Sequence, residues 1–123
     1  MLKPLSKNST IGVLAPAFPP DAQKLQKGAA YLHERGHRVI MGKTPTARHG
    51  YFAGNDQLRL EELQTMFANP EIDMIICARG GWGTLRLLNQ IDYALLQAHP
   101  KALVGYSDIT TLQLAFWKKA GLP

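Results

Sequence analysis

The hydrophobic positions of this chain alternate between short continuous runs and segments of helical spacing. The continuous runs predict four buried strands, at residues 10–15, 37–41, 72–78 and 102–104. Helical spacing predicts helices between Asp21 and Gly36, at 56–68, at about 109–120, and in a short segment that carries Leu85, Leu87 and Leu88. Strands that alternate with helices in this way form an open, mainly parallel sheet with helices on both faces. We therefore predict an α/β fold.

Three candidate functional segments lie just after predicted strands. Pro16 follows the first strand, Arg79 to Gly83 follow the third, and Ser107 comes shortly after the fourth. Ligands of parallel α/β sheets bind beyond the carboxyl ends of the strands. We therefore expect the functional site at this edge of the sheet.

Ser107 stands between a predicted strand and a predicted helix. A serine at such a sharp turn exposes its hydroxyl, and backbone N–H groups at the helix start, such as that of Asp108, can hold a developing oxyanion. The alternative is that Ser107 and Asp108 simply cap the helix, which both residue types do readily. Position 109 is Ile rather than the Gly of the usual nucleophile motif, so local sequence leaves both interpretations open.

The segment Arg79-Gly80-Gly81-Trp82-Gly83 has three glycines in four positions. Glycine lets the backbone approach a ligand closely and adopt positive φ angles, which presents N–H donors to an anion. Beside Ser107, one of these N–H groups can supply the second half of an oxyanion hole. The alternatives are a phosphate-binding turn, whose usual spacings are absent, and a tight connection with Arg79 in a salt bridge.

Composition narrows the class of function. At 123 residues, with 46% hydrophobic and 19% charged, the chain is typical of one soluble globular domain. Its net charge of +5 is spread along the sequence without a basic stripe, so we expect no nucleic-acid partner. No stretch approaches the roughly 20 apolar residues of a membrane span, and no signal peptide is visible. We expect a cytoplasmic protein with no membrane partner.

Groups that can activate Ser107 or hold a metal are scarce. The single cysteine excludes a paired Cys-x-x-Cys site, and we expect neither a metal nor a cofactor. His99 precedes the fourth strand, so it belongs at the opposite edge of the sheet from Ser107. Cys77 lies inside an apolar run and is assigned to the core, and Asp73 and Asp92 are assigned to turns or caps. The chain therefore offers no convincing Ser–His–acid set.

A series of motifs runs in order through nearly the whole chain, from about Ile11 to Gly121. Its parts are Gly54-x-Asp56-x-x-Arg59-x-x-x-Leu63, Phe67-Ala68-Asn69-Pro70-x-Ile72-Asp73, Cys77 to Gly83, Arg86-Leu87-Leu88, Ile91-Asp92-Tyr93, His99-Pro100-Lys101 and Gly105 to Thr110. Joined at these separations, the motifs resemble the LD-carboxypeptidase family, which includes murein tetrapeptide carboxypeptidases and microcin-immunity peptidases.

The resemblance implies a three-layer domain of flavodoxin-like or class I glutamine amidotransferase-like type, and a serine peptidase of the bacterial cytoplasm. Its substrate would be a murein-derived peptide from cell-wall recycling, and it would hydrolyse the L–D amide bond to the terminal D-alanine of murein tetrapeptide. Ser107 matches the family's nucleophile, and the N–H groups of Asp108 and Gly81 match its oxyanion donors. Substrate contacts are expected from the loop residues Arg79, Gly80 and Trp82.

The resemblance also implies that part of the site lies elsewhere. In this family the catalytic Glu and His come from a carboxy-terminal domain, whereas this sequence stops at Pro123. We therefore expect residues 1–123 to be the amino-terminal nucleophile domain, and to be inactive alone, because a serine without its base is a weak nucleophile. The apolar surface that would meet the second domain then favours self-association as a homodimer.

Three other functions stay open at this point. A microcin-immunity peptidase would apply the same serine chemistry to a peptidyl-nucleotide amide. A non-catalytic domain would bind an anionic or peptide ligand through the loop from Gly80 to Gly83. A flavodoxin-like phosphate binder would hold a nucleotide or a flavin.

Overall fold

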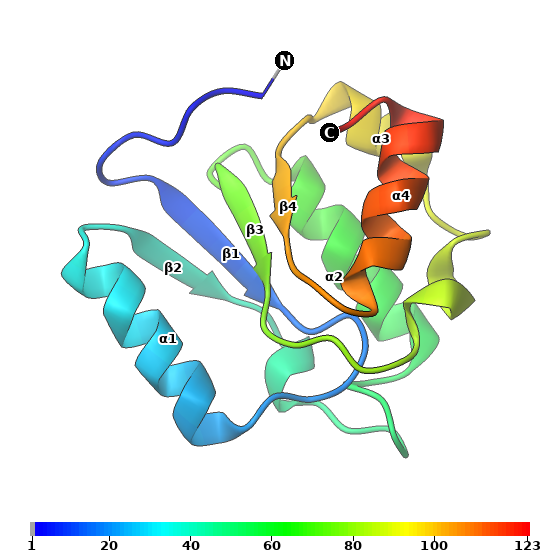
Figure 1. Cartoon of the computed structure of the whole chain (residues 1–123), viewed down its shortest axis with the longest axis horizontal. Coiled ribbons are helices and arrows are strands. Elements are labelled where there is room, and N and C mark those ends of the chain that lie inside the picture. Colours follow the sequence, from blue (N-terminus) through cyan, green and yellow to red (C-terminus); the bar gives the residue numbers. More distant parts are fainter. Residues whose placement is uncertain (1) are drawn as a thin grey trace.

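The computed structural model describes residues 2–123, and within them four strands form one sheet whose neighbouring strands are all parallel. The strands are β1 (Thr10–Leu14), β2 (Arg38–Met41), β3 (Met74–Cys77) and β4 (Ala102–Val104), in the spatial order β2-β1-β3-β4. The helices are α1 (Ala22–Glu34), α2 (Asp56–Ala68), α3 (Tyr93–Ala98) and α4 (Ile109–Ala120), with short 3-10 turns at Thr44–Thr46 and Thr84–Leu87. The predicted α/β fold is confirmed (Figure 1).

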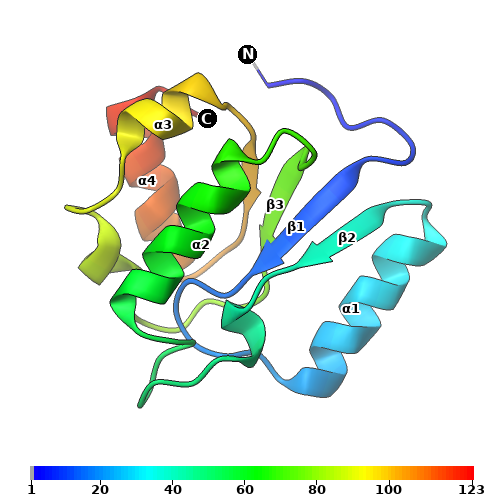
Figure 2. The ribbon, with the colours of Figure 1, turned by 180° about the vertical axis from the view of Figure 1, so that it is seen from behind.

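Helices cover both faces of the sheet. α2 lies behind the sheet in Figure 1 and in front of it in Figure 2, whereas α1 lies on the opposite face. The fully buried β1 serves both sides, because successive strand residues point to opposite faces. Leu14 belongs to the core beneath α2, α3 and α4, and Val13 lines a groove beneath α1. No residue of α1 is buried, so this helix packs more loosely than those across the sheet.

Side-chain caps fix where three helices begin. Asp21, Asn55 and Asp92 each accept a backbone N–H from the first turn of α1, α2 and α3, at 2.8–3.0 Å. Gly36 adopts a φ of 89° just after α1, where a residue without a side chain avoids strain. The predicted start and end of α1 and the assignment of Asp92 to a cap are confirmed.

Two parts of the chain differ from the prediction. The sequence pattern did not reveal α3, since a helix of six residues is too short to display a helical period. The segment with Leu85 and Leu87 is a 3-10 turn rather than an α-helix, and a second such turn lies between β2 and α2, at Thr44–Thr46. Neither difference alters the order of the strands.

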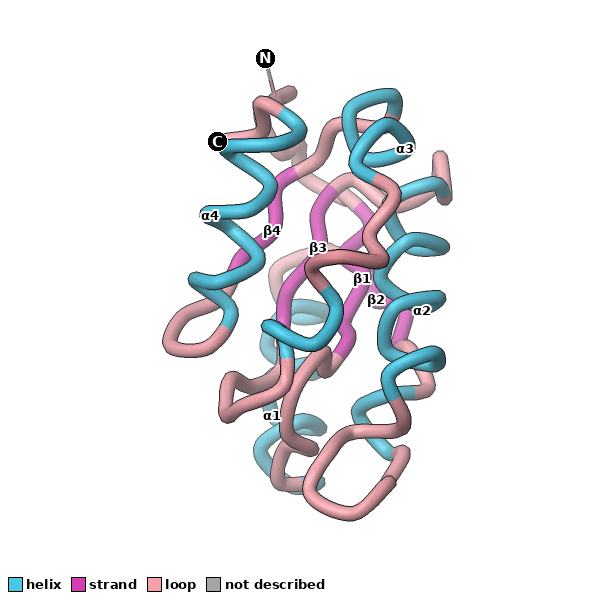
Figure 3. Tube along the Cα trace, turned by 90° about the vertical axis from the view of Figure 1, so that its right-hand side faces the viewer, coloured by secondary structure: helices cyan, strands magenta, loops and turns pink. Residues whose placement is uncertain are grey.

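The carboxyl ends of all four strands point to the same end of the molecule. The loops that follow them gather there (Figures 1 and 3). They comprise residues 15–21 after β1, 42–55 after β2, 78–83 after β3 and 105–108 after β4. The site is built from these four loops.

Candidate active site

The backbone turns sharply at Ser107. Ser107 is exposed and has a φ of 58°, and among the described residues only Asn8 shares such an angle without being glycine. A left-handed conformation costs a residue with a side chain about 1–2 kcal/mol, so its surroundings must hold it in place. The turn sits between the end of β4 at Val104 and the start of α4 at Ile109.

Asp108 ties this turn to the neighbouring loop. Its side chain makes no capping hydrogen bond to α4. Instead its carboxylate accepts the Thr84 N–H at 3.0 Å, while Thr84 Oγ1 donates to the Asp108 carbonyl at 2.9 Å. The capping alternative is therefore not observed for Asp108, whose side chain joins the Ser107 turn to the end of the glycine-rich loop.

The glycine-rich loop packs directly on Ser107. A methyl group on Gly80 would lie 3.0 Å from Ser107 Cβ and 3.2 Å from the Tyr106 carbonyl oxygen, so a side chain at this position would force the two loops apart. Gly81 has a φ of 121°, and a methyl group there would lie 2.6 Å from Phe18 Cβ. Gly80 thus allows the close approach to Ser107. Gly81 allows both a close approach to Phe18 and a positive φ angle.

Two backbone donors beside Ser107 are available to a ligand. Within residues 2–123, no backbone carbonyl accepts the N–H of Asp108 or of Gly81. One belongs to the start of α4 and the other to the loop that packs on Ser107. In acyl transfer, two backbone N–H groups aimed at one point beside a nucleophilic hydroxyl stabilise the oxyanion, so these two groups are candidates for that role.

An aromatic cluster, made of Phe18, Tyr51, Phe52 and Trp82, borders the glycine-rich loop. Successive ring centroids lie 4.6, 5.6 and 5.5 Å apart. Tyr51 and Trp82 remain half exposed. Phe18 and Tyr51 are not among the predicted site residues. The available signal was the aromatic pair Tyr51-Phe52 in a glycine-bounded loop after a strand.

Arg59 holds three of the four loops together. It is 1% exposed, and its guanidinium donates to the carbonyl of Pro16 at 2.8 Å, of Gly83 at 3.1 Å and of Gly54 at 3.2 Å. It also pairs with the Asp56 carboxylate. No periodic pattern singles out this role, because on α2 a buried arginine looks like a surface one.

Asp56 is shared between Arg59 and the exposed Arg86. Arg86 pairs with the same carboxylate at 2.8 Å. The hydrogen bond from Arg86 is the largest of the effects that hold the pKa of Asp56 below its usual value. The ring of Phe52 lies against both guanidinium groups, 4.6 Å from Arg59 and 5.3 Å from Arg86.

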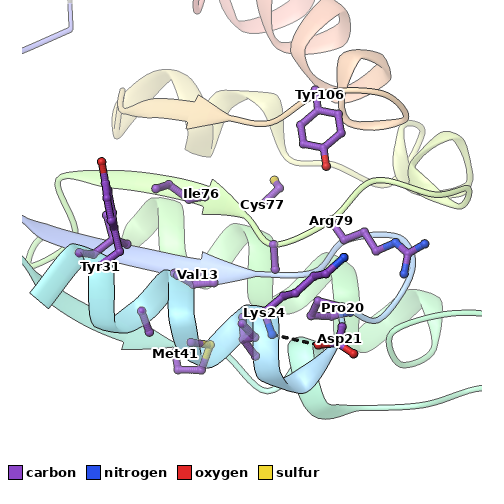
Figure 4. Close-up of a pocket in the computed structure, with 15 residues that line it drawn as sticks. Val13, Pro20, Asp21, Lys24, Tyr31, Met41, Ile76, Cys77, Arg79 and Tyr106 are labelled. Atoms are coloured by element: carbon purple, nitrogen blue, oxygen red, sulfur yellow. Dashed lines mark hydrogen bonds between the residues drawn. The ribbon is translucent and has the colours of Figure 1, made fainter.

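A groove of about 600 Å³ runs between α1 and the sheet and reaches the site at one end. Its floor includes Val13 and Ile76. Arg79 and Tyr106, which immediately precede Gly80 and Ser107, lie at one end of the groove, and Tyr31 lies at the other (Figure 4).

Residues that sequence analysis kept out of the site lie away from it. Cys77 is buried in the core, and burial raises the pKa of its thiol, so this assignment is confirmed. His99 ends α3 and lies with Asp73 and Lys101 at the opposite edge of the sheet from Ser107. No group of three or more His, Cys, Asp or Glu residues that could hold a metal occurs within residues 2–123. Nor does any helix in that range combine the length and apolar character needed to cross a bilayer.

These features define an α/β domain with a candidate serine nucleophile at the carboxyl edge of its sheet. Residues 11–123 match the LD-carboxypeptidase N-terminal domain, and the chain belongs to the LD-carboxypeptidase family. The resemblance seen in the sequence motifs is confirmed.

Relatives carry carboxypeptidase and microcin-immunity names. The probable murein peptide carboxypeptidase of Bacillus subtilis (strain 168) is 46% identical over 120 residues, which are 98% of this chain and 38% of that protein. The murein tetrapeptide carboxypeptidase of Pseudomonas aeruginosa is 37% identical over 114 residues, 92% of this chain and 37% of that protein.

A solved structure of the microcin C7 self-immunity protein in complex with aspartyl sulfamoyl adenosine superimposes with a TM-score of 0.93 and 30% identity, covering 98% of this chain and 37% of that one. The microcin C7 self-immunity protein of Escherichia coli is 32% identical over 122 residues, 97% of this chain and 36% of that protein. The chain thus spans little more than a third of each relative.

Proposed function

We propose that this chain supplies the nucleophile part of a serine LD-carboxypeptidase, which hydrolyses the L–D amide bond to the terminal D-alanine of murein tetrapeptide. Ser107 is the nucleophile, and the N–H groups of Asp108 and Gly81 are the oxyanion donors. The observation that carries the proposal is the left-handed turn at Ser107 packed against Gly80. Relatives named murein peptide carboxypeptidases support the substrate and a role in bacterial cell-wall recycling, which we propose takes place in the cytoplasm.

The reaction follows from these groups. Ser107 Oγ attacks the scissile carbonyl carbon while a base takes its proton, and the two N–H groups stabilise the negative charge that develops on the carbonyl oxygen. The C–N bond then breaks, D-alanine leaves with a proton on its nitrogen, and water hydrolyses the acyl-enzyme. Arg79, Gly80 and Trp82 contact the substrate.

The base and its acidic partner come from a carboxy-terminal domain beyond residues 1–123. This part of the proposal is supported by the length of the relatives, of which the chain spans little more than a third. Without a base, a serine hydroxyl is a weak nucleophile, so the 123 residues alone do not hydrolyse the peptide.

The test joins this chain to the carboxy-terminal remainder of the Bacillus subtilis relative and measures D-alanine release from murein tetrapeptide. We expect release by the joined protein, none by the chain alone, and none after Ser107→Ala in the joined protein. Release by the chain alone would contradict the missing base and make His49, in the loop that carries Tyr51 and Phe52, the first residue to replace. Release that survives Ser107→Ala would overturn the nucleophile.

The superposition on the microcin C7 self-immunity protein favours a second candidate, hydrolysis of a peptidyl-nucleotide amide by the same serine. Competition between murein tetrapeptide and an aspartyl-adenylate amide, measured on the joined protein, separates the two. A non-catalytic binding domain predicts instead that no serine reagent labels Ser107 and that Ser107→Ala leaves ligand affinity unchanged.

A further inference from the structure

A carboxypeptidase must recognise the free carboxylate of the residue that it releases. That carboxylate is attached to the carbon next to the scissile nitrogen, so bond lengths keep it within about 5 Å of the scissile carbonyl. Its binding group therefore has to lie in the loops that surround the oxyanion donors. The identity of this carboxylate-binding residue is inferred below on the basis of the proposed function.

Three arginines in or beside these loops already have partners within the chain. Arg59 is buried and held by Asp56 and three backbone carbonyls, and Arg86 pairs with the same Asp56. Arg48 donates to the carbonyl of Ala47. Arg59 and Arg86 are thus already paired with a carboxylate of the chain, whereas Arg48 makes only one contact, with a neighbouring carbonyl.

Arg79 differs from Arg59 and Arg86 in having no carboxylate partner in the described part of the chain, and from Arg48 in standing directly before Gly80. It immediately precedes Gly80, the residue in contact with Ser107, and no carboxylate within residues 2–123 forms an ion pair with it. The salt-bridge alternative from the sequence is therefore not observed in the described part of the chain. Its guanidinium lies 4.5 Å from the ring centroid of Phe18, the residue that packs against Gly81.

The contact with Phe18 prepares Arg79 for this role. Stacking on an aromatic face holds a guanidinium in place without using its N–H donors. Those donors lie in one plane, which matches the two oxygens of a carboxylate. The exposed side chain lies at the end of the α1 groove beside the site, with Tyr106 across from it (Figure 4).

We propose that Arg79 binds the free terminal carboxylate of the released residue and so makes the site a carboxypeptidase rather than an endopeptidase. Arg79 is then the residue that determines specificity for a chain end. The aromatic ring of Phe18 acts as its support, and the oxyanion donors act on the carbonyl next to the carboxylate.

The experiment compares two substrates in the joined protein described above. One is murein tetrapeptide, and the other is the same peptide with its terminal carboxylate converted to a neutral amide. We expect wild type to prefer the free carboxylate by about 10- to 100-fold in kcat/KM, the usual worth of a charge-assisted hydrogen-bonded contact. Arg79→Gln should lose this preference because kcat/KM falls for the free-acid substrate and stays unchanged for the amide. Arg79→Lys should keep part of the preference.

Lys24→Gln is the matched control, since it removes a positive charge from the same groove at a residue outside the proposed site. It should retain the full preference. An Arg79→Gln variant that slows both substrates equally, or neither, overturns the role of Arg79 and leaves the serine mechanism intact. Absence of Ser107-dependent hydrolysis of either substrate by wild type overturns the proposed function, and the role of Arg79 with it.

Discussion

Ser107 combines an unfavourable backbone conformation with an exposed hydroxyl group. Its left-handed backbone favours glycine, yet the position carries a hydroxymethyl side chain that is exposed rather than packed in the core. A residue that is unfavourable for the backbone and unneeded for packing is better explained by what its hydroxyl does. The strained backbone of Ser107 therefore supports its proposed role as the nucleophile. This strain can be measured separately from catalysis.

Replacing Ser107 by Gly should yield a more stable chain than replacing it by Ala. Glycine adopts a φ of 58° without a steric penalty, whereas the side chain of alanine retains that penalty. We therefore expect a difference of about 1 kcal/mol in the free energy of unfolding. Urea denaturation of the two variants measures it. Equal stabilities, or a more stable Ala variant, would show that the turn is not left-handed in solution.

Among single residues, the sequence indicated those whose residue type alone points to a role in the site. Ser107 and the glycines at 80 and 81 stand out because few residue types serve at a strand-to-helix turn or in a close backbone approach. Arg59 and Phe18 carry no such signal. Their importance depends on contacts with residues distant in sequence, such as Gly83 and Gly81, which only the folded chain brings together.

At the scale of elements, α2 organises the site through Arg59. Arg59→Gln should lower the free energy of unfolding by about 3 kcal/mol or more, because three buried carbonyls and the Asp56 carboxylate lose a charged partner. Arg86→Gln removes an exposed partner of the same carboxylate and should change stability little. Urea denaturation of both variants checks this, and comparable losses would mean that the ion pair matters more than the buried carbonyls.

Lys101 connects the opposite end of α2 to the start of β4. Its buried ammonium donates to the carbonyls of Met66, Asn69 and Ile72 at 2.7–3.2 Å, and desolvation lowers its pKa. Lys101→Met should cost about 2 kcal/mol, since these carbonyls lose a charged donor. Lys118→Met, a change at an exposed site on α4, is the control. Thermal and urea unfolding that fail to separate the two variants would refute the connection.

Elements with a full helical period or a clear apolar run were predictable from sequence, and the short helix α3 was not. The limits of α2, β4 and α4 match the apolar pattern, because each has a clear spacing or a short apolar run followed by a break. α3 has six residues and was missed, although its cap at Asp92 was anticipated. The cap alone does not reveal how many residues follow.

On the scale of the whole molecule, the two faces of the sheet are unequally covered. One carries α2, α3 and α4 over a shared core, and the other carries α1, none of whose residues is buried. The carboxyl edge carries the proposed nucleophile Ser107 and the proposed oxyanion donors. The loose packing of α1 and the length of the relatives, of which the chain spans little more than a third, support the proposal that this unit works with another part of a longer protein.

Large apolar side chains on the outer face of α4 lead to the last prediction. Leu114 and Trp117 lie one turn apart and are 59% and 65% exposed, an arrangement that favours association between copies of the chain. Sedimentation velocity should show the mean mass rising with concentration for wild type and rising less for Trp117→Lys. Tyr31→Lys, the same change of charge at an exposed aromatic residue on α1, should behave as wild type. If both variants reduce association equally, net charge rather than the α4 surface controls it; if wild type stays monomeric, that surface does not bind a second copy.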